Sequence, residues 1–457
     1  MHGRKNLDMT KGSILSNLVQ FSIPLMATSI LQLLYNAADV AVVGRFAGAQ
    51  ALAAVGSTGS LVTLLTYFFV GLSLGCNVVI AHAKGAKNED KISRLVHTSI
   101  ALAILSGILV LGIGLFASRP MLQMMNSPED VIDLATLYLT IYFLGMPATM
   151  LYNFGASILR AMGDTKSPLI YLSVAGAVNV LLNLLTVIVF RMGVAGVAIA
   201  TVASQVISAA FVIVHLRNAH DCTHLEWKKI GLEMNLVREI VKVGVPSGVQ
   251  SCLFSVSNVI IQSAINAQGS AVMAGNAAGG SLEGFAYVVM SAFTSANLTF
   301  VSTNRGARLY SRVRRGLWVS MAAILVAGSG VSMLFYVLRD SLLRLYNTDP
   351  QVIYWGNFRL QYILPIYFLC GLMDVGGAHL RGIGFSFPQM FIALTGACAF
   401  RLFWIFVIYN PHPDMGVLYL SYPISWALTI AAYLAFYGLV ALPRLKKEEL
   451  EGKTHAG

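Results

Sequence analysis

A single carboxylate lies inside the first long apolar stretch of the chain. Residues 21–45 read FSIPLMATSILQLLYNAADVAVVGR, and Asp39 is the only charged residue before Arg45. In a helix that rises 1.5 Å per residue, Asp39 lies about 9 Å before Arg45, below the surface of a hydrocarbon layer about 30 Å thick. An ionised Asp near mid-helix costs roughly 2.5–3.5 kcal/mol in that layer, so we expect Asp39 to face a bundle interior or a wet cavity.

Other polar residues accompany this carboxylate. Gln32, Tyr35 and Asn36 precede Asp39 at helical spacing and share its helix face. Amide and hydroxyl oxygens beside one carboxylate suit a small hard cation, or can hydrogen-bond a protonated acid. The sequence therefore predicts an ion-coupling site for H⁺ or Na⁺, with Asp39 as the ligand of any Na⁺. Its predicted members are Asp39, Asn36, Asn153, Asn179, Asn183 and Thr201. Two simpler interpretations stay open: an Asp39 that snorkels to the interface, and amides that only join helices.

Charged residues also fall inside apolar stretches of the second half. Glu283 and Asp374 are the acids there, and Arg401 is the one base that the pattern places deep in a helix. Carboxylates persist in such positions only with a partner or a task, so we predict that both bind substrate. Gln32 and Tyr35 are assigned to the same role. The alternatives are an ion pair between Asp374 and Arg401, and a protonated Glu283 that packs between helices. His379 is expected at an interface.

Composition sets the class of protein. Of 457 residues, 56% are apolar and 11% are charged, against about 25% charged in soluble domains. The net charge of +11 is not gathered into a basic, aromatic-rich face, so nucleic-acid binding is excluded. The five cysteines form no CxxC pair and are expected to be small packing residues. His220, Cys222 and His224 match no standard metal site.

Apolar runs long enough to cross a membrane recur along the whole chain. We predict an all-α membrane protein with about twelve transmembrane helices. The expected spans are 18–43, 51–81, 95–117, 131–158, 168–190, 194–216, 240–266, 271–302, 317–338, 352–380, 388–409 and 416–441. They divide into a first lobe (1–217), a cytoplasmic linker (218–239) with a partly amphipathic segment, and a second lobe (240–457).

The basic residues are distributed unequally between alternate loops. About 24 of the 31 Lys and Arg residues lie in the terminal tails and in the loops of one face, and about six lie on the other. This bias predicts cytoplasmic termini in a plasma (inner) membrane protein.

The two halves resemble each other at an almost constant offset in sequence. Six spans per half is an even number, so the lobes run parallel and are related by a pseudo-two-fold axis along the membrane normal, with a substrate path between them. This arrangement is typical of a transporter. The offset pairs Gly85 with Gly306, Ala86 with Ala307, Ser99 with Ser320, Asn126 with Asn347, Arg160 with Arg381 and Gly163 with Gly384.

The chain resembles the multidrug and toxic compound extrusion (MATE) transporters, and among them it most resembles the DinF-like bacterial members. The likeness runs from about residue 14 to 440 and rests on FSIPLMATSILQLLYNAADVAVVGRF with LAAVG, on ILRAMGDTKSP and on HLRGIGFSFP. It implies an antiporter that exchanges Na⁺ or H⁺ for organic, often cationic, compounds and needs no cofactor. A monomer among membrane lipids is expected.

The resemblance also carries site residues. It places Asp39 where the family has its first-span coupling carboxylate, with Asn153, Asn179 and Thr201 as matching neighbours. Asn183 departs from the pattern, because the DinF-like branch often has Asp there. Asp374 resembles a tenth-span acid of NorM-like members, and Glu283 an eighth-span acid of some relatives.

Other functions are weighed against the antiporter. A flippase for lipids or lipid-linked oligosaccharides from the same superfamily also has two six-span lobes, but we expect more deep basic residues in it. An enzyme is disfavoured because no HExxH, GxSxG or acidic metal pair is present. No nucleotide-binding loop appears, which argues against ATP-driven transport, and a passive channel gives no reason for a two-lobe repeat.

Overall fold

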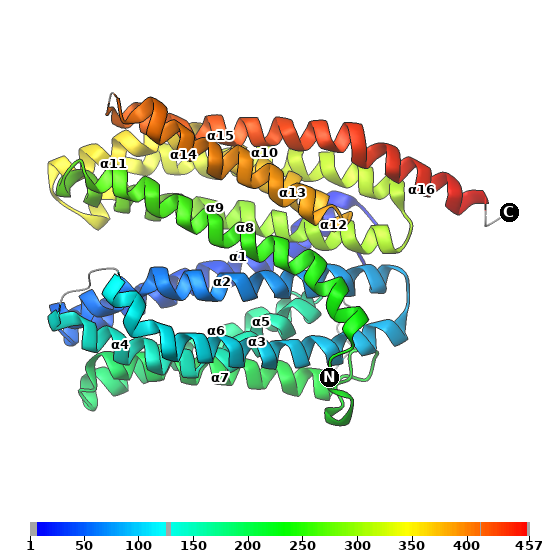
Figure 1. Cartoon of the computed structure of the whole chain (residues 1–457), viewed down its shortest axis with the longest axis horizontal. Helices are drawn as coiled ribbons and strands as arrows, with labels where there is room; N and C mark the ends of the chain where they lie inside the picture. The colour runs from blue at the N-terminus through cyan, green and yellow to red at the C-terminus, as the bar shows by residue number, and fades with distance from the viewer. Residues whose placement is uncertain (1–6, 125–128, 412, 455–457) are drawn as a thin grey trace. The chain divides into compact units, whose positions relative to one another are not determined.

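The computed structural model describes residues 7–124, 129–411 and 413–454 as a helical protein (Figure 1). Asn126, which the repeat pairs with Asn347, lies outside these ranges. The first half contains α1 (Ile14–Phe46), α2 (Ala49–Gly85), α3 (Glu89–Met124), α4 (Glu129–Leu144), α5 (Met146–Ala161), α6 (Lys166–Asn183), the π-helical segment η1 (Leu184–Val189) and α7 (Gly193–Arg217).

The second half follows a short 3₁₀ turn, η2 (Trp227–Lys229). It contains α8 (Met234–Asn266), α9 (Ser270–Gly306), α10 (Tyr310–Tyr346), α11 (Pro350–Ile363), η3 (Leu364–Ile366), α12 (Phe368–Gly382), α13 (Ser386–Ala393), η4 (Leu394–Ala399), α14 (Phe400–Phe403), η5 (Trp404–Tyr409), α15 (Met415–Phe436), η6 (Tyr437–Ala441) and α16 (Leu442–Thr454).

The predicted membrane spans correspond to these helices. Within the described ranges, ten helices are long and apolar enough to cross a bilayer, and two bent pairs raise the number to as many as twelve. The first pair bends by 47° between α4 and α5, and the second by 50° between η3 and α12. Pro147 closely follows the first bend, and Pro365 precedes the second. Each proline lacks a backbone N–H, so one helical hydrogen bond is missing near each bend.

The backbone repeats the offset between the two halves at its turns. Gly48 and Gly269, which precede α2 and α9, have φ values of 91° and 105°. Gly163 and Gly384 have φ values of 80° and 90°, in the turns before α6 and α13. Even Lys87 and Arg308, a non-glycine pair related by the same offset, are both left-handed. Because left-handed backbone strongly favours glycine, the shared turn geometry explains why glycines recur at this offset.

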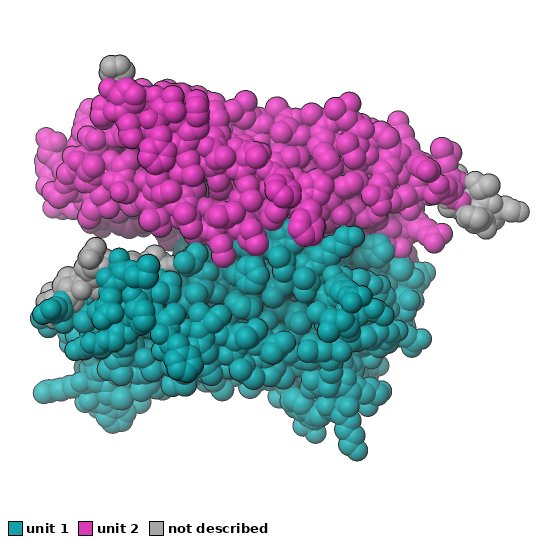
Figure 2. All heavy atoms as spheres, viewed as in Figure 1, with its two compact units in different colours: residues 1–7, 27–248 teal, residues 8–26, 249–457 magenta. Residues whose placement is uncertain are grey.

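Contacts divide the described chain into two compact units, coloured separately in Figure 2. One unit comprises residue 7 and residues 27–248, and the other comprises residues 8–26 and 249–454. Both α1 and α8 are therefore divided: each contributes its first part to one unit and its second part to the other. The lobe boundaries predicted from the sequence, 1–217 and 240–457, keep α1 whole and leave residues 234–239 of α8 in the linker; they stay a prediction.

The connection after α7 is fastened to the first unit. Leu225 is buried in its apolar core, and the backbone N–H of Glu226 donates to His97 Nε2 at 3.0 Å. Trp227 and Leu232 are exposed, so only part of the predicted amphipathic segment has its apolar side chains outside the core. Farther on, Lys91 pairs with Glu239 at 2.8 Å, which holds the start of α8 to α3.

The start of the chain is fixed to the second unit through its backbone. Arg312 donates to the carbonyl oxygens of Gly12 at 2.8 Å, Met9 at 3.2 Å and Lys11 at 3.3 Å. Asn304 also donates to the Met9 carbonyl, at 3.0 Å, and accepts from Arg312 Nε. The short segment before α1 is thus held by two side chains of the α9–α10 region.

Candidate functional site

Asp39 lies against α6 and α7 of the first unit. The Asn183 amide donates a hydrogen bond to Asp39 Oδ1 and a second one, at 3.3 Å, to Asn179 Oδ1. The Thr201 hydroxyl, which also donates to the Val197 carbonyl at 3.0 Å, lies close enough to hydrogen-bond the carboxyl. Asp39 and three of the other five residues predicted for ion coupling therefore form one group.

The Asn183 amide has one unused acceptor. Both of its bonds come from Nδ2, and its carbonyl oxygen is buried without a partner among the described residues. An ionised Asp39 accepts this N–H, and a protonated Asp39 can also donate to the amide oxygen once the amide has turned over. The site can thus take up a proton by rotation of one amide.

The same donors fit a monovalent cation. Carboxylate, amide and hydroxyl oxygens from Asp39, Asn179, Asn183 and Thr201 are hard ligands of the type that Na⁺ accepts. No group of three His, Cys, Asp or Glu side chains that could hold a metal occurs among the described residues. Asp39 is the single carboxylate among the residues predicted for ion coupling.

Aromatic side chains surround this carboxylate. Tyr35 donates to the Ser173 carbonyl at 3.2 Å, and its ring packs so closely on Gly176 that a side chain at that position would overlap it. On α4, Tyr138 and Tyr142 stack with ring centroids 5.9 Å apart in the neighbourhood of Asp39. The neighbourhood of the carboxylate is thus partly apolar, which favours its neutral or ion-bound form.

Three other predicted residues are not joined to Asp39 in the described structure. Asn153 donates to the Thr149 carbonyl of its own helix at 2.8 Å. Gln32 and Asn36 are exposed on α1 and make no hydrogen bond to the carboxyl. Their spacing correctly predicted one helix face, but a face is wider than the group of side chains that a single carboxylate can contact.

In the second unit, Glu283 forms an ion pair that the sequence did not predict. Arg359 Nε and Nη2 donate to the two Glu283 oxygens at 2.6 and 2.7 Å, and both residues are 7% exposed. Arg359 also donates to Asn276, which accepts from Tyr419 at 3.3 Å and donates to Gln262 at 3.1 Å. The prediction that Arg401 is the only base deep in a helix was therefore wrong. Arg359 is a second one, because it lies about 14 Å along α11 from the first residue of this helix, Pro350.

Asp374 has a phenol as its partner. The Tyr287 hydroxyl donates to Asp374 Oδ2 at 2.6 Å. The expected ion pair between Asp374 and Arg401 is absent from the described structure, where Arg401 Nε instead donates to Ser425 Oγ at 2.9 Å. Both residues lie on the predicted helices, but helix assignment does not fix which way two side chains turn.

His379 lies in the last turn of α12, near a span end as expected. It is fully buried, its ring lies 5.4 Å from that of Tyr437, and neither ring nitrogen has a partner among the described residues. Its place at a membrane interface stays a prediction.

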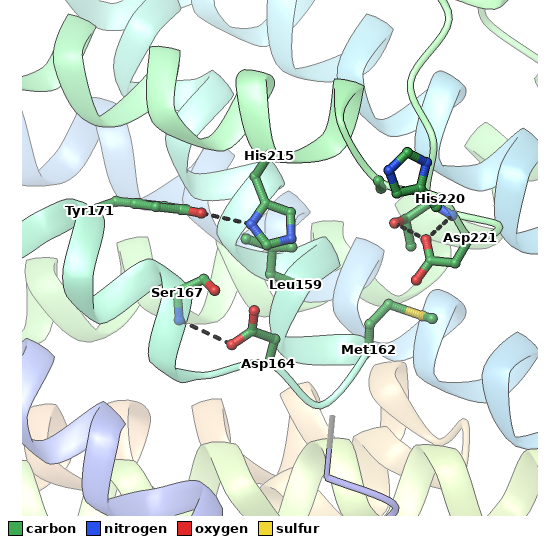
Figure 3. Close-up of a pocket in the computed structure, with 10 residues that line it drawn as sticks. Leu159, Met162, Asp164, Ser167, Tyr171, His215, His220 and Asp221 are labelled. Carbon is green, nitrogen blue, oxygen red and sulfur yellow. Dashed lines mark hydrogen bonds between the residues drawn. The ribbon is translucent and has the colours of Figure 1, made fainter. Parts of the chain in front are cut away.

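A separate cavity of about 430 Å³ lies where the α5–α6 turn meets the end of α7 (Figure 3). Asp164 and Asp221 face it from two loops, and each uses one oxygen to accept from backbone N–H groups. Tyr171 and His215 join across it at 2.6 Å. None of the residues predicted for coupling or substrate binding lines this cavity, so it is distinct from the Asp39 site.

The MatE family pattern matches this sequence twice, at residues 24–185 and 246–407. The chain belongs to the MatE family. The second match begins at Pro246 as the first begins at Pro24, which confirms the internal repeat, and the first contains Asp39, Asn153, Asn179 and Asn183. Membership makes the chain a transporter and not an enzyme, and such transporters need no cofactor.

Curated relatives and solved structures agree with this MatE assignment. The chain is 27% identical to a probable multidrug resistance protein, YoeA, of Bacillus subtilis, over 94% of this chain and 95% of the relative. Another from the same organism, YpnP, is 28% identical over 88% of each chain. An outward-facing multidrug resistance MATE family transporter of the MOP superfamily superposes with a TM-score of 0.90, at 20% identity, over 98% of this chain and all of the other. The fold is therefore the two-lobe fold of MatE transporters, and the chain is a multi-pass membrane protein.

Proposed function

We propose that this MatE protein is a secondary active efflux antiporter that exchanges H⁺ or Na⁺ for organic compounds by alternating access. The observation that carries the proposal is the single carboxylate Asp39, held by Asn183 beside Asn179 and Thr201 in a membrane helix. The relatives named multidrug resistance proteins support small organic molecules as substrates.

The coupling step uses the two charge states of Asp39. When ionised and empty, the carboxylate holds a negative charge in a poorly solvated part of the first unit and accepts from Asn183. A proton or Na⁺ that arrives from outside neutralises this charge, and the Asn183 amide turns its carbonyl oxygen toward it. The neutral form biases the helices around Asn179 and Asn183 toward one of two arrangements, as a ligand with unequal affinity for two states must do.

Purified protein in liposomes tests this proposal. Efflux of a cationic dye is measured under an imposed Na⁺ gradient and, separately, under an imposed H⁺ gradient. We expect one of the two to drive dye against its own gradient. Flux that follows only the dye gradient, with no effect of either ion, would indicate a channel and contradict antiport.

Asp374 is proposed to attract cationic substrates into the second unit. Its carboxylate is half-buried and has the Tyr287 hydroxyl as its hydrogen-bond donor, which leaves its charge uncompensated by a direct ion pair among the described residues. We expect Asp374→Asn to slow export of a cationic dye about tenfold, which corresponds to a loss of about 1.4 kcal/mol of attraction for the cation. A neutral dye should be exported at the wild-type rate. Equal losses for both dyes, with a lowered thermal stability, would instead show a structural role.

The main alternative is a lipid flippase of the same superfamily. We expected few deep basic residues to argue against it, but Arg359 is buried as well as Arg401. The Glu283 carboxylate neutralises Arg359, however, so this residue offers no charge to a lipid phosphate. Scrambling of a fluorescent phospholipid in liposomes distinguishes the two functions: a flippase moves the lipid, and the proposed antiporter does not.

The proposed setting is the plasma (inner) membrane, with cytoplasmic termini and a cytoplasmic 218–239 connection. The excess of Lys and Arg on this face supports it. A cysteine placed at Lys228, which lies in the exposed η2 turn, is expected to react with an impermeant maleimide in inside-out vesicles and not in intact cells. Labelling in intact cells would contradict the proposed topology and place this connection outside the cell. The transporter is proposed to act as a monomer in contact with membrane lipids.

A further inference from the structure

Arg401 is a buried base on α14 of the second half. It is 4% exposed, and the π-helical segment η5 begins three residues after it, at Trp404.

The Arg401 side chain is stacked on aromatic rings. Its guanidinium carbon lies 4.6 Å from the Tyr422 ring centroid and 5.9 Å from that of Trp426. Its Nε donates to Ser425 Oγ at 2.9 Å, while the Ser425 hydroxyl donates to the Tyr422 carbonyl at 2.7 Å. A guanidinium that stacks by its face keeps its edge free for hydrogen bonds.

The outer edge of Arg401 has no partner in the described part of the chain. No carboxylate lies within ion-pair distance, and the two terminal nitrogens make no hydrogen bond there. Arg401 as a whole is 4% exposed, and its terminal nitrogens are not fully enclosed. Arg359 is the internal comparison: it is buried to a similar degree, but Glu283 and Asn276 take up its edge.

These features fit a planar anionic group. A carboxylate accepts two parallel hydrogen bonds from the edge of a guanidinium, and Tyr422 and Trp426 supply rings for the aromatic part of a compound. We propose that Arg401 binds the carboxylate of aromatic substrates, so that this transporter accepts acidic and zwitterionic compounds. Asp374 on α12 and Arg401 on α14 lie in helices that both pack on α15, so the second unit carries a group opposite in sign to each charge of a zwitterion. The inference deepens the proposed function by naming a substrate class.

Binding of a matched pair of fluorescent probes tests it without any ion gradient. Dansylglycine and dansylglycinamide share ring and size and differ in the carboxylate. In purified wild-type protein in a neutral detergent, we expect dansylglycine to bind at least tenfold more tightly. Arg401→Gln should abolish this preference, and Arg401→Lys should retain a small part of it, because an ammonium group cannot form the bidentate contact. The affinity for dansylglycinamide should not change.

The controls separate recognition from folding. Arg359→Lys alters the other buried arginine and is expected to leave the ratio of the two affinities unchanged in whatever protein remains folded. Equal wild-type affinities for the two probes, or a preference that survives in Arg401→Gln, would overturn the proposal. If neither Arg401 variant folds, the ratio of the wild-type affinities for dansylglycine and dansylglycinamide decides whether the carboxylate is recognised. Because the assay measures binding alone, a failure of ion coupling would leave its result unaffected.

A lipid headgroup is the other source of an anionic group. The wild-type measurement is repeated in nanodiscs of phosphatidylcholine with and without phosphatidylglycerol. Dansylglycine binding that is the same in both supports a small acid as the ligand. Loss of this binding in phosphatidylglycerol would assign Arg401 to the lipid and overturn the substrate proposal.

Discussion

Asp39→Asn is expected to leave this transporter folded and able to bind substrate, but unable to concentrate it. The substitution keeps the shape of the side chain and its contact with Asn183 while removing the group that changes charge. One charge moved through 100 mV supplies about 2.3 kcal/mol, which sustains a gradient of roughly 50-fold. We therefore expect the variant to lose about this factor in steady-state dye accumulation, measured in liposomes under the driving ion gradient.

Asn153→Ala is the matched control for this experiment. Asn153 was predicted as a member of the same site, but its amide bonds only the Thr149 carbonyl of its own helix. Its removal should change accumulation less than twofold. Gradient-driven accumulation at the wild-type level in Asp39→Asn would contradict the coupling mechanism, and an equal loss in both variants would argue for a site wider than the four residues at Asp39.

Glu283→Gln is expected to produce the largest loss of stability. It leaves the Arg359 charge buried without its carboxylate partner, and breaking a buried ion pair on one side costs about 3–5 kcal/mol. The variant should unfold at a markedly lower temperature, measured by thermal denaturation of the purified protein in detergent. Dye export should decline only as far as the amount of folded protein declines.

The double variant Glu283→Gln, Arg359→Met tests the reason for this loss. Removal of both charges takes away the uncompensated guanidinium, so most of the stability should return. If Glu283→Gln alone has wild-type stability and selectively loses export of cations, Glu283 binds substrate instead. The sequence-based prediction of that role would then hold.

The helices and their order could be predicted from the sequence because a bilayer imposes a strong rule. Long apolar runs must be helical there, and the repeat between the halves recurs in the backbone as paired left-handed turns at Gly163 and Gly384. The Asp39 group was also largely predictable, because Asn179 and Asn183 are one helical turn apart and both are rare polar residues in an apolar run.

What could not be predicted depends on side-chain direction and depth. Arg359 follows a loop closely enough to be counted with the exposed bases, yet α11 carries it inward to Glu283. Arg401 and Asp374 lie on correctly predicted helices, but one turns toward Ser425 and the other toward Tyr287. Periodicity gives the face of one helix, and the pairing of two faces depends on packing that no single helix encodes.

The attachment of the first residues of the chain has a consequence for how this region can evolve. Arg312 and Asn304 bind only main-chain oxygens of Met9, Lys11 and Gly12, and every amino acid supplies such an oxygen. The attachment therefore constrains the length of this stretch and the guanidinium at position 312, while the residue type is constrained where the side chain is buried, as at Met9, or the backbone is left-handed, as at Gly12. Homologues should vary at the exposed Lys11, keep an apolar residue at position 9 and glycine at position 12, and rarely carry insertions or deletions.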